Sequence, residues 1–344
     1  MLIRAHLPSL IGVIIVDLLS RILGIGMVVI GLLALLLAVY AIRRYKRLLK
    51  LVSLPLIILS VLCVDAGTGY AGRGDTSPRT ITVTAAKNAP NQLILLFHGY
   101  NGNGQSLATI LGAKLATHGT VVAFEPGTKG YDSDKVLAAA EQAIKTNRPS
   151  EIVLYGESLG GMEVMELLRR NPDLHVRSVV FNATPSTVGN VKLGGSALKV
   201  LDTPVLLHGG LISTEILRAN LAKDLGNAPS PEKGVDEVAR QQAYGAMRQV
   251  TGRTAFDELR FIANFSSPRP DEFVGRADTV YYLHAPGTSD STVKTAASSN
   301  DLSKAFTHAR FVDDPIPEWG PDLHCPTPER PTPVINELLA ASQG

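Results

Sequence analysis

One stretch decides the fold of this chain, Ile152-Val153-Leu154-Tyr155-Gly156-Glu157-Ser158-Leu159-Gly160-Gly161. Its leading apolar residues are typical of a buried strand, and they run directly into the pattern Gly-x-Ser-x-Gly. An amphipathic helix pattern follows at once and ends at Asn171-Pro172. The two glycines of the pattern allow the tight turn that places a serine between a strand and a helix. We therefore predict that the Ser158 hydroxyl projects above the edge of a sheet, ready to act as a nucleophile.

In this strand–turn–helix setting the motif resembles the nucleophile elbow of the α/β-hydrolase family, which includes serine esterases and lipases. The resemblance covers roughly residues 78–344. It implies a doubly wound, mostly parallel sheet, with the partners of the serine on loops that follow late strands. It also implies that these partners come in the chain order serine, acid, histidine.

The sequence around the motif alternates between strand and helix patterns, which predicts an α/β fold with ligands at the carboxyl ends of parallel strands. Helices are expected from Ser106, from Asp132 or Ser133, and over Val334–Leu339. The further expected strands are Thr80–Thr84, Leu93–Phe97, Thr120–Phe124, Ser178–Phe181, Thr279–His284 and Ala309–Val312.

Residues 184–275 interrupt this alternation. The run Pro204–His208 could be another strand of the sheet, or it could belong to a helical cap inserted over the active site. We favour a cap over about 184–275, because Thr279–His284 fits the late strand better.

The resemblance implies an acid after the 279–284 strand and a histidine after the 309–312 strand. Asp290 lies in Gly287-Thr288-Ser289-Asp290-Ser291-Thr292-Val293, which resembles the Gly…Asp…Val turn of the family. Glu215 would be the rival acid if 204–208 were the true late strand. His324 lies in a loop rich in proline and glycine after the last strand, and it is the expected base. The remaining histidines are expected to be structural or solvated.

Two backbone N–H groups are needed to bind the oxyanion that forms when serine attacks a carbonyl. One is that of Leu159, directly after the nucleophile. His98-Gly99 ends a strand run and resembles the family motif that supplies the second donor, so we expect it to be the N–H of Tyr100.

The N-terminal region predicts a membrane anchor over residues 1–64. Ile22–Ile42 is an apolar run long enough to cross a bilayer, which takes about 20 residues. The basic loop Arg43–Lys50 follows, and the apolar run Leu48–Val64, interrupted by Pro55, is a second candidate span. We favour two spans, which form a helical hairpin with the basic loop in the cytoplasm and the catalytic domain outside it.

Other interpretations of this region stay open. Arg43–Ala71 could instead be an internal signal-like segment. The earlier run Leu7–Leu19 could be interfacial or could prolong the first helix. Residues 65–79 are rich in small and polar residues and predict a linker, with the hydrolase domain over residues 80–344.

The net charge and the two cysteines narrow the classes of partner and cofactor that we expect. The net charge of +2 does not favour nucleic acid as a partner. Cys63 and Cys325 lie far apart in the sequence, which does not favour a disulfide between them, and they have no metal-site spacing. The serine mechanism implies no metal or cofactor. The chain is thus expected to be a membrane-anchored serine hydrolase that cleaves a small-molecule or lipid ester through an acyl-enzyme. Alternatives are acyl transfer to an alcohol of an envelope lipid or sugar, and a non-catalytic binding domain on the same fold.

Overall fold

A computed structural model describes residues 7–44, 49–72, 75–100, 102–127, 129–192, 210, 252–285, 290 and 292–315 of the chain. The chain divides into two compact units. The first comprises Met1–Thr76 with Ser196–Ala222, and the second comprises Ser77–Gly195 with Lys223–Gly344.

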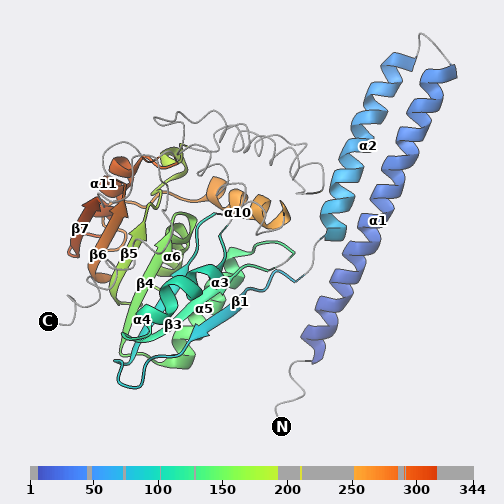
Figure 1. Cartoon of the computed structure of the whole chain (residues 1–344). Coiled ribbons are helices and arrows are strands. Elements are labelled where there is room, and N and C mark those ends of the chain that lie inside the picture. Colours follow the sequence, from blue (N-terminus) through green and yellow to red (C-terminus); the bar gives the residue numbers. More distant parts are fainter. Residues whose placement is uncertain are drawn as a thin grey trace. The chain divides into compact units, whose positions relative to one another are not determined.

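The second unit is built on a seven-stranded sheet in the order β1-β3-β2-β4-β5-β6-β7 (Figure 1). Strand β1 pairs antiparallel with β3, and every other pair is parallel. The mostly parallel sheet predicted from the sequence is therefore confirmed. The strands are β1 (Arg79–Val83), β2 (Gln92–Phe97), β3 (Thr120–Glu125), β4 (Glu151–Glu157), β5 (Val176–Asn182), β6 (Ala277–His284) and β7 (Arg310–Pro315).

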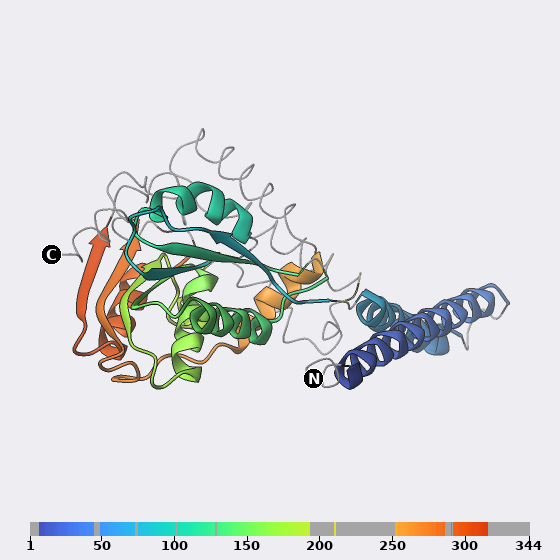
Figure 2. The same ribbon diagram turned by 90° about the horizontal axis from the view of Figure 1, so that it is seen from below.

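Helices cover both faces of this sheet, with the segment α3 to α4 on one face and α5 and α6 on the other (Figure 2). All six residues of β2 are buried, as expected for a parallel strand covered on both sides. The described helices of this unit are α3 (Gly104–Leu107), the π-helical turn η1 (Ala108–Gly112), α4 (Ala113–Leu115), α5 (Ser133–Asn147), α6 (Leu159–Arg170), the 3₁₀ turn η2 (Val188–Asn190), α10 (Gly252–Asn264) and α11 (Thr295–Ala305).

Two helix starts can be compared with the sequence. Asp132 caps α5, because its Oδ1 accepts from the backbone N–H of Asp134 at 3.1 Å. The prediction that Ser106 begins the helix after β2 is wrong by a few residues. Asn103 is the cap of α3, and its Oδ1 accepts from the N–H of Ser106 at 2.7 Å. Asparagine and serine are both good caps, and only the fold decides between them.

The predicted cap is described only in part. Residues 193–209 and 211–251, with the run 204–208, lie outside the described residues. Its last part packs beside α6, where Arg169 Nε lies 2.9 Å from Glu272 Oε1 and Arg169 Nη2 donates to the Ser266 carbonyl at 2.9 Å. Residues 252–275 therefore extend the helical layer next to α6, and a cap formed by the other residues stays a prediction.

The first unit contains α1 (Leu7–Arg44) and α2 (Leu49–Gly72), which lie side by side (Figure 1). Small residues allow the close contact. The Ser60 hydroxyl donates to the Gly31 carbonyl at 2.7 Å, and a Cβ on Gly67 would lie 2.5 Å from the Gly24 carbonyl oxygen. Leu7–Leu19 is part of α1, so this run prolongs the first helix.

Helix α2 corrects the predicted start of the linker. Residues 65–72 are helical, because Gly67 fits closely against α1 and the Thr68 hydroxyl donates to the Val64 carbonyl at 2.8 Å. In the described residues, the only helix long and apolar enough to cross a membrane is Ile22–Tyr40; the apolar part of α2, Ser53–Gly69, is shorter. The second span stays a prediction.

Candidate functional site

Ser158 occupies the turn between β4 and α6. Its φ is +50° and its ψ is −112°, a combination that non-glycine residues rarely adopt. Holding a residue in such a conformation costs about 1–3 kcal/mol, so the surrounding structure must impose it. The Ser158 N–H donates to the Asn182 carbonyl at 2.8 Å, which ties the turn to the end of β5. This is the strained strand–turn–helix geometry that the sequence motif predicts.

The two glycines of the motif are required by close approach. A Cβ on Gly160 would lie 2.2 Å from the Phe97 carbonyl oxygen, so α6 begins directly against the end of β2. A Cβ on Gly156 would lie 2.5 Å from the Gly161 Cα, within the turn itself. Neither position has room for a side chain.

Buried polar groups support the turn from the neighbouring strand. The Thr184 hydroxyl donates to the Gly156 carbonyl at 3.2 Å, and the Tyr282 hydroxyl donates to the Thr184 carbonyl at 3.0 Å. The Asn182 side-chain amide donates to the Tyr155 hydroxyl at 2.8 Å. These hydrogen bonds connect the nucleophile turn to β5 and β6.

The expected oxyanion donors lie next to this turn. Leu159 is the first residue of α6, where helix N–H groups have no acceptor within the helix and the helix dipole favours negative charge. The loop after β2 is closed by a hydrogen bond from the Gly102 N–H to the Gly99 carbonyl at 2.8 Å. A Cβ on Gly99 would lie 3.4 Å from the Ser158 Cβ, so the loop that carries Tyr100 reaches the nucleophile. The oxyanion role of Leu159 and Tyr100 stays a prediction.

His98 has a structural environment. Its side chain is buried, and Nδ1 donates to the Gly99 carbonyl at 2.8 Å. Burial lowers the pKa of His98 from its usual value, so the ring is neutral at neutral pH. The imidazole therefore shapes the loop, as the sequence analysis expected.

Asp290 lies in the connection after β6 and is almost completely buried, at 1% exposure. Its Oδ1 accepts from the backbone N–H groups of Thr292 at 2.7 Å and Val293 at 2.8 Å, which orients the carboxylate. The Lys192 ammonium donates to the Asp290 carbonyl at 2.8 Å. Because β4, β5 and β6 are parallel, Asp290 and Ser158 follow carboxyl ends at the same edge of the sheet.

His324 and Glu215 lie outside the described residues, so the base and the rival acid stay predictions. Two other histidines pair with carboxylates. His284 lies at the carboxyl end of β6, with Nε2 3.0 Å from Asp313 Oδ1. His175 Nε2 lies 3.3 Å from Asp278 Oδ1, and its side chain is more than half exposed.

The structure also contains a buried carboxyl group that the sequence analysis missed. The amphipathic pattern of α6 places Glu163 on the solvent side, but the residue is 1% exposed and accepts from the Tyr131 hydroxyl at 2.7 Å. Tyr131, which precedes α5, lies against the carboxyl group, and α10 packs beside α6. Burial raises the pKa of Glu163 to about 8. The apolar stripe of Phe256, Leu259 and Ile262 in α10 is the sequence signal for this second layer.

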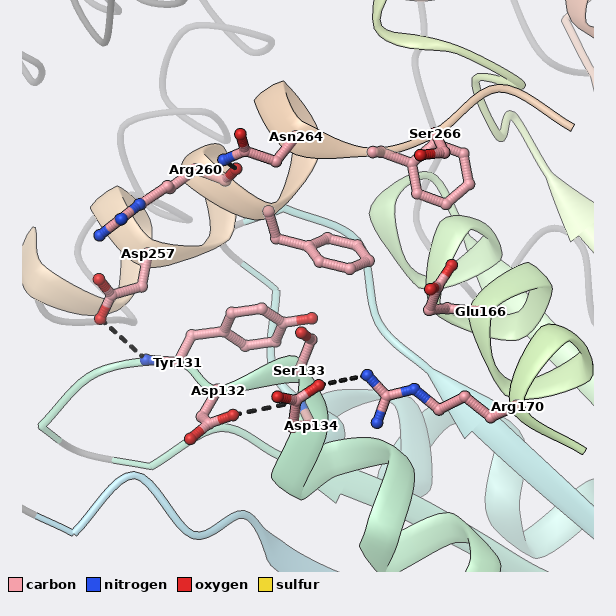
Figure 3. A pocket seen from close by; sticks show the side chains of 12 residues that line it. Tyr131, Asp132, Ser133, Asp134, Glu166, Arg170, Asp257, Arg260, Asn264 and Ser266 are labelled. Carbon is pink, nitrogen blue, oxygen red and sulfur yellow. Dashed lines mark hydrogen bonds and ion pairs between the residues drawn. The ribbon is translucent and has the colours of Figure 1, made fainter.

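A cavity of about 630 Å³ opens between the start of α5, the second half of α6 and α10 (Figure 3). Several of its charged groups are paired with one another or with close neighbours. Asp134 pairs with Arg170, and Asp257 accepts from the Tyr131 N–H at 3.3 Å and from Arg253 at 2.9 Å. Ser158, Tyr100 and Asp290 do not line it. The cavity is therefore separate from the candidate nucleophile.

No metal site is evident in the part of the chain that the structure describes, because no group of three or more His, Cys, Asp or Glu side chains is suitably placed there. A serine at a strained turn, a buried carboxylate and backbone N–H groups near that turn are the kinds of groups that acyl transfer through serine uses.

Comparisons with known proteins support the fold. No protein-family model matches the chain, and no curated protein matches it. Solved structures do match. An esterase from Rhodococcus sp. ECU1013 is 18% identical, with a TM-score of 0.52, covering 78% of this chain and 95% of its own.

Two further structures match over a similar length. The enol-lactonase from Burkholderia xenovorans LB400 is 16% identical, with a TM-score of 0.53, covering 77% of this chain and 96% of its own. The type II thioesterase BorB from the borrelidin biosynthetic cluster is 18% identical, with a TM-score of 0.51, covering 79% and 99%. At these identities the likeness shows the fold alone, and that fold is the α/β-hydrolase fold.

Proposed function

We propose that this chain is a membrane-anchored serine hydrolase that cleaves a carboxylic ester through an acyl-enzyme intermediate. The observation that carries the proposal is the backbone of Ser158, held at φ +50° between a parallel strand and a helix. A structural serine has no need of a conformation that costs about 1–3 kcal/mol, whereas a nucleophile needs the sharp turn that presents its hydroxyl at the edge of the sheet.

In this proposal Ser158 attacks the ester carbonyl while His324 takes its proton as general base. Asp290 orients His324 and stabilises the imidazolium that forms. The N–H groups of Leu159 and Tyr100 bind the oxyanion of the tetrahedral intermediate. Collapse of this intermediate expels the alcohol, which takes its proton from His324, and water activated in the same way then releases the acid.

Support for ester cleavage also comes from the solved structures of this fold. Their descriptions name an esterase, a thioesterase and an enol-lactonase, which all break an acyl–oxygen or acyl–sulfur bond. Membrane attachment is supported by Ile22–Tyr40. The large apolar side chains that α1 exposes there would lie in lipid, and they are Ile22, Leu23, Ile25, Val29, Ile30, Leu32, Leu33, Leu35, Leu36, Leu37, Val39 and Tyr40.

The direct test is labelling of the full-length protein in membranes with a fluorophosphonate probe. We expect the wild type to be labelled and Ser158→Ala to be unlabelled. Turnover of a short p-nitrophenyl ester should fall by up to about 10⁶-fold in this variant, the scale known for triad nucleophiles. Ser299→Ala is the matched control, since it removes another buried hydroxyl of the same unit. Labelling that survives in Ser158→Ala would contradict the mechanism.

Turnover of the p-nitrophenyl ester by the wild type also tests acyl transfer. If an added alcohol diverts the product from free acid to a new ester, the acyl-enzyme is partitioned to an alcohol acceptor in place of water. If the wild type neither reacts with the probe nor turns over esters, the domain is a binding module on this fold.

A further inference from the structure

A line of side-chain contacts runs along the carboxyl edge of the sheet, from the nucleophile turn towards β7. It begins with the hydrogen bonds from Thr184 to the Gly156 carbonyl and from Tyr282 to the Thr184 carbonyl. The ring of Tyr282 then lies against the ring of His284, with 5.5 Å between the centroids. His284 in turn contacts Asp313 on β7. The line therefore joins β4 to β7 across two intervening strands (Figure 1).

The His284 imidazole touches two different parts of this edge. Its Nδ1 lies 2.6 Å from the Ala285 carbonyl oxygen, which can only accept, so Nδ1 carries a hydrogen. Its Nε2 lies 3.0 Å from Asp313 Oδ1, at ion-pair distance although not aligned as a hydrogen bond. The ring therefore contacts the start of the acid loop through Nδ1 and strand β7 through Nε2.

The His284–Asp313 pair lies on the two strands that precede the proposed acid and the proposed base. His284 is the last residue of β6, and the connection to Asp290 begins at Ala285. Asp313 lies on β7, the strand at the end of the sheet that precedes His324 in the sequence. The pair thus links the carboxyl ends of the two strands that lead to the acid and to the base of the proposed triad.

We propose that His284 and Asp313 are positioning residues, which set the separation between the acid loop after β6 and the strand that leads to the base. They act through Asp290 and His324 and do not touch the reacting atoms. The inference rests on the proposed function, because it assigns the pair a role in that same reaction.

Asp313→Asn tests the inference, with Asp278→Asn as the matched control. Asp278 forms a second His–Asp pair among the described residues, with His175, at the opposite end of β6. We expect Asp313→Asn to lower kcat and the rate of fluorophosphonate labelling about tenfold or more, since a misplacement of about 1 Å can cost 10²-fold. KM and Tm should stay close to the wild type, and Asp278→Asn should leave all four quantities unchanged.

His284→Gln is the second variant and should lower kcat to a similar degree. The double variant should be no slower than His284→Gln alone, because both changes break one interaction. Wild-type kcat in both single variants, an equal loss in Asp278→Asn, or losses that multiply in the double variant would each overturn the inference. A wild type that is inert to the probe would instead overturn the proposed function, and this inference with it.

Discussion

The Ser158 N–H donates to the Asn182 carbonyl at 2.8 Å, so the residue after β4 is held by the last residue of β5. In a parallel pair, this bond continues the ladder one residue beyond the strand, and it stops the chain from relaxing out of the strained turn. Asn182 is itself held through its side chain by the Tyr155 hydroxyl. Hydrogen bonds of the sheet therefore hold Ser158 in its strained conformation.

The first prediction concerns the acid. Asp290→Asn should lower kcat by about 10⁴-fold, because an amide favours the wrong tautomer of the catalytic histidine. The carboxamide oxygen can still accept from the Thr292 and Val293 N–H groups, so Tm should change little. Steady-state kinetics with a p-nitrophenyl ester and a thermal melt measure the two effects. Glu215→Gln is the comparison, and a larger loss in that variant would mean that 204–208 is the late strand.

The second prediction concerns the helix start. Gly160→Ala should destabilise the protein, because the new Cβ would lie 2.2 Å from the Phe97 carbonyl oxygen. Overpacking of this kind typically costs about 1–3 kcal/mol. The helix must also move away from β2, which displaces the Leu159 N–H and should lower kcat. In Gly189→Ala the nearest atom, the Thr187 hydroxyl oxygen, is 3.3 Å away, so this control should melt like the wild type.

The third prediction uses the buried carboxyl of Glu163, whose pKa is raised to about 8 from an ordinary value of 4.5. At a pH between these two pKa values, the Glu163 carboxyl group has lost its proton in the unfolded chain but keeps it in the folded chain. Folding then takes up a proton, and the free energy of unfolding falls as the pH rises from about 5 to 8. Glu163→Gln still accepts from Tyr131 but has no proton to lose. It should therefore be more stable than the wild type by about 3–5 kcal/mol at pH 8, and by little at pH 4.5.

Denaturant titrations at several pH values measure this difference. Glu166→Gln is the control, since Glu166 lies on the same helix, is partly exposed and pairs with Arg169. Its stability difference from the wild type should not grow between pH 5 and 8. A Glu163→Gln variant with a pH-independent stability difference would show that Glu163 is ionised in the folded protein.

The fourth prediction concerns the side of the membrane on which the second unit, which contains Ser158, lies. Ser77 is exposed and follows α2. In a background with Cys63→Ser and Cys325→Ser, Ser77→Cys should react with a membrane-impermeant maleimide in intact cells if both α1 and α2 cross the bilayer. Labelling only after lysis would mean that α1 alone spans and that the second unit is cytoplasmic, since the basic loop Arg43–Lys50 stays inside in either topology.

The sequence by itself determined the features that depend on local backbone and periodicity. Gly156 and Gly160 predict a turn without room for side chains, and the apolar runs around them predict parallel strands. Such signals are carried by a few neighbouring residues, so Ser158 and the strand before Asp290 could be located without coordinates. The proposed role of His324 rests only on its place after the last strand.

Only the tertiary structure decided which polar groups are buried and what they contact. Glu163 has the spacing of a solvent-facing residue, but it is buried and contacts Tyr131, which lies far away in the sequence. Residues 65–72 have the composition of a linker, and they are helical because Gly67 packs against α1. His284 and Asp313 meet because β6 and β7 are neighbours in the sheet. Burial and pairing are properties of segments that come together in space, and local sequence does not encode which segments these are.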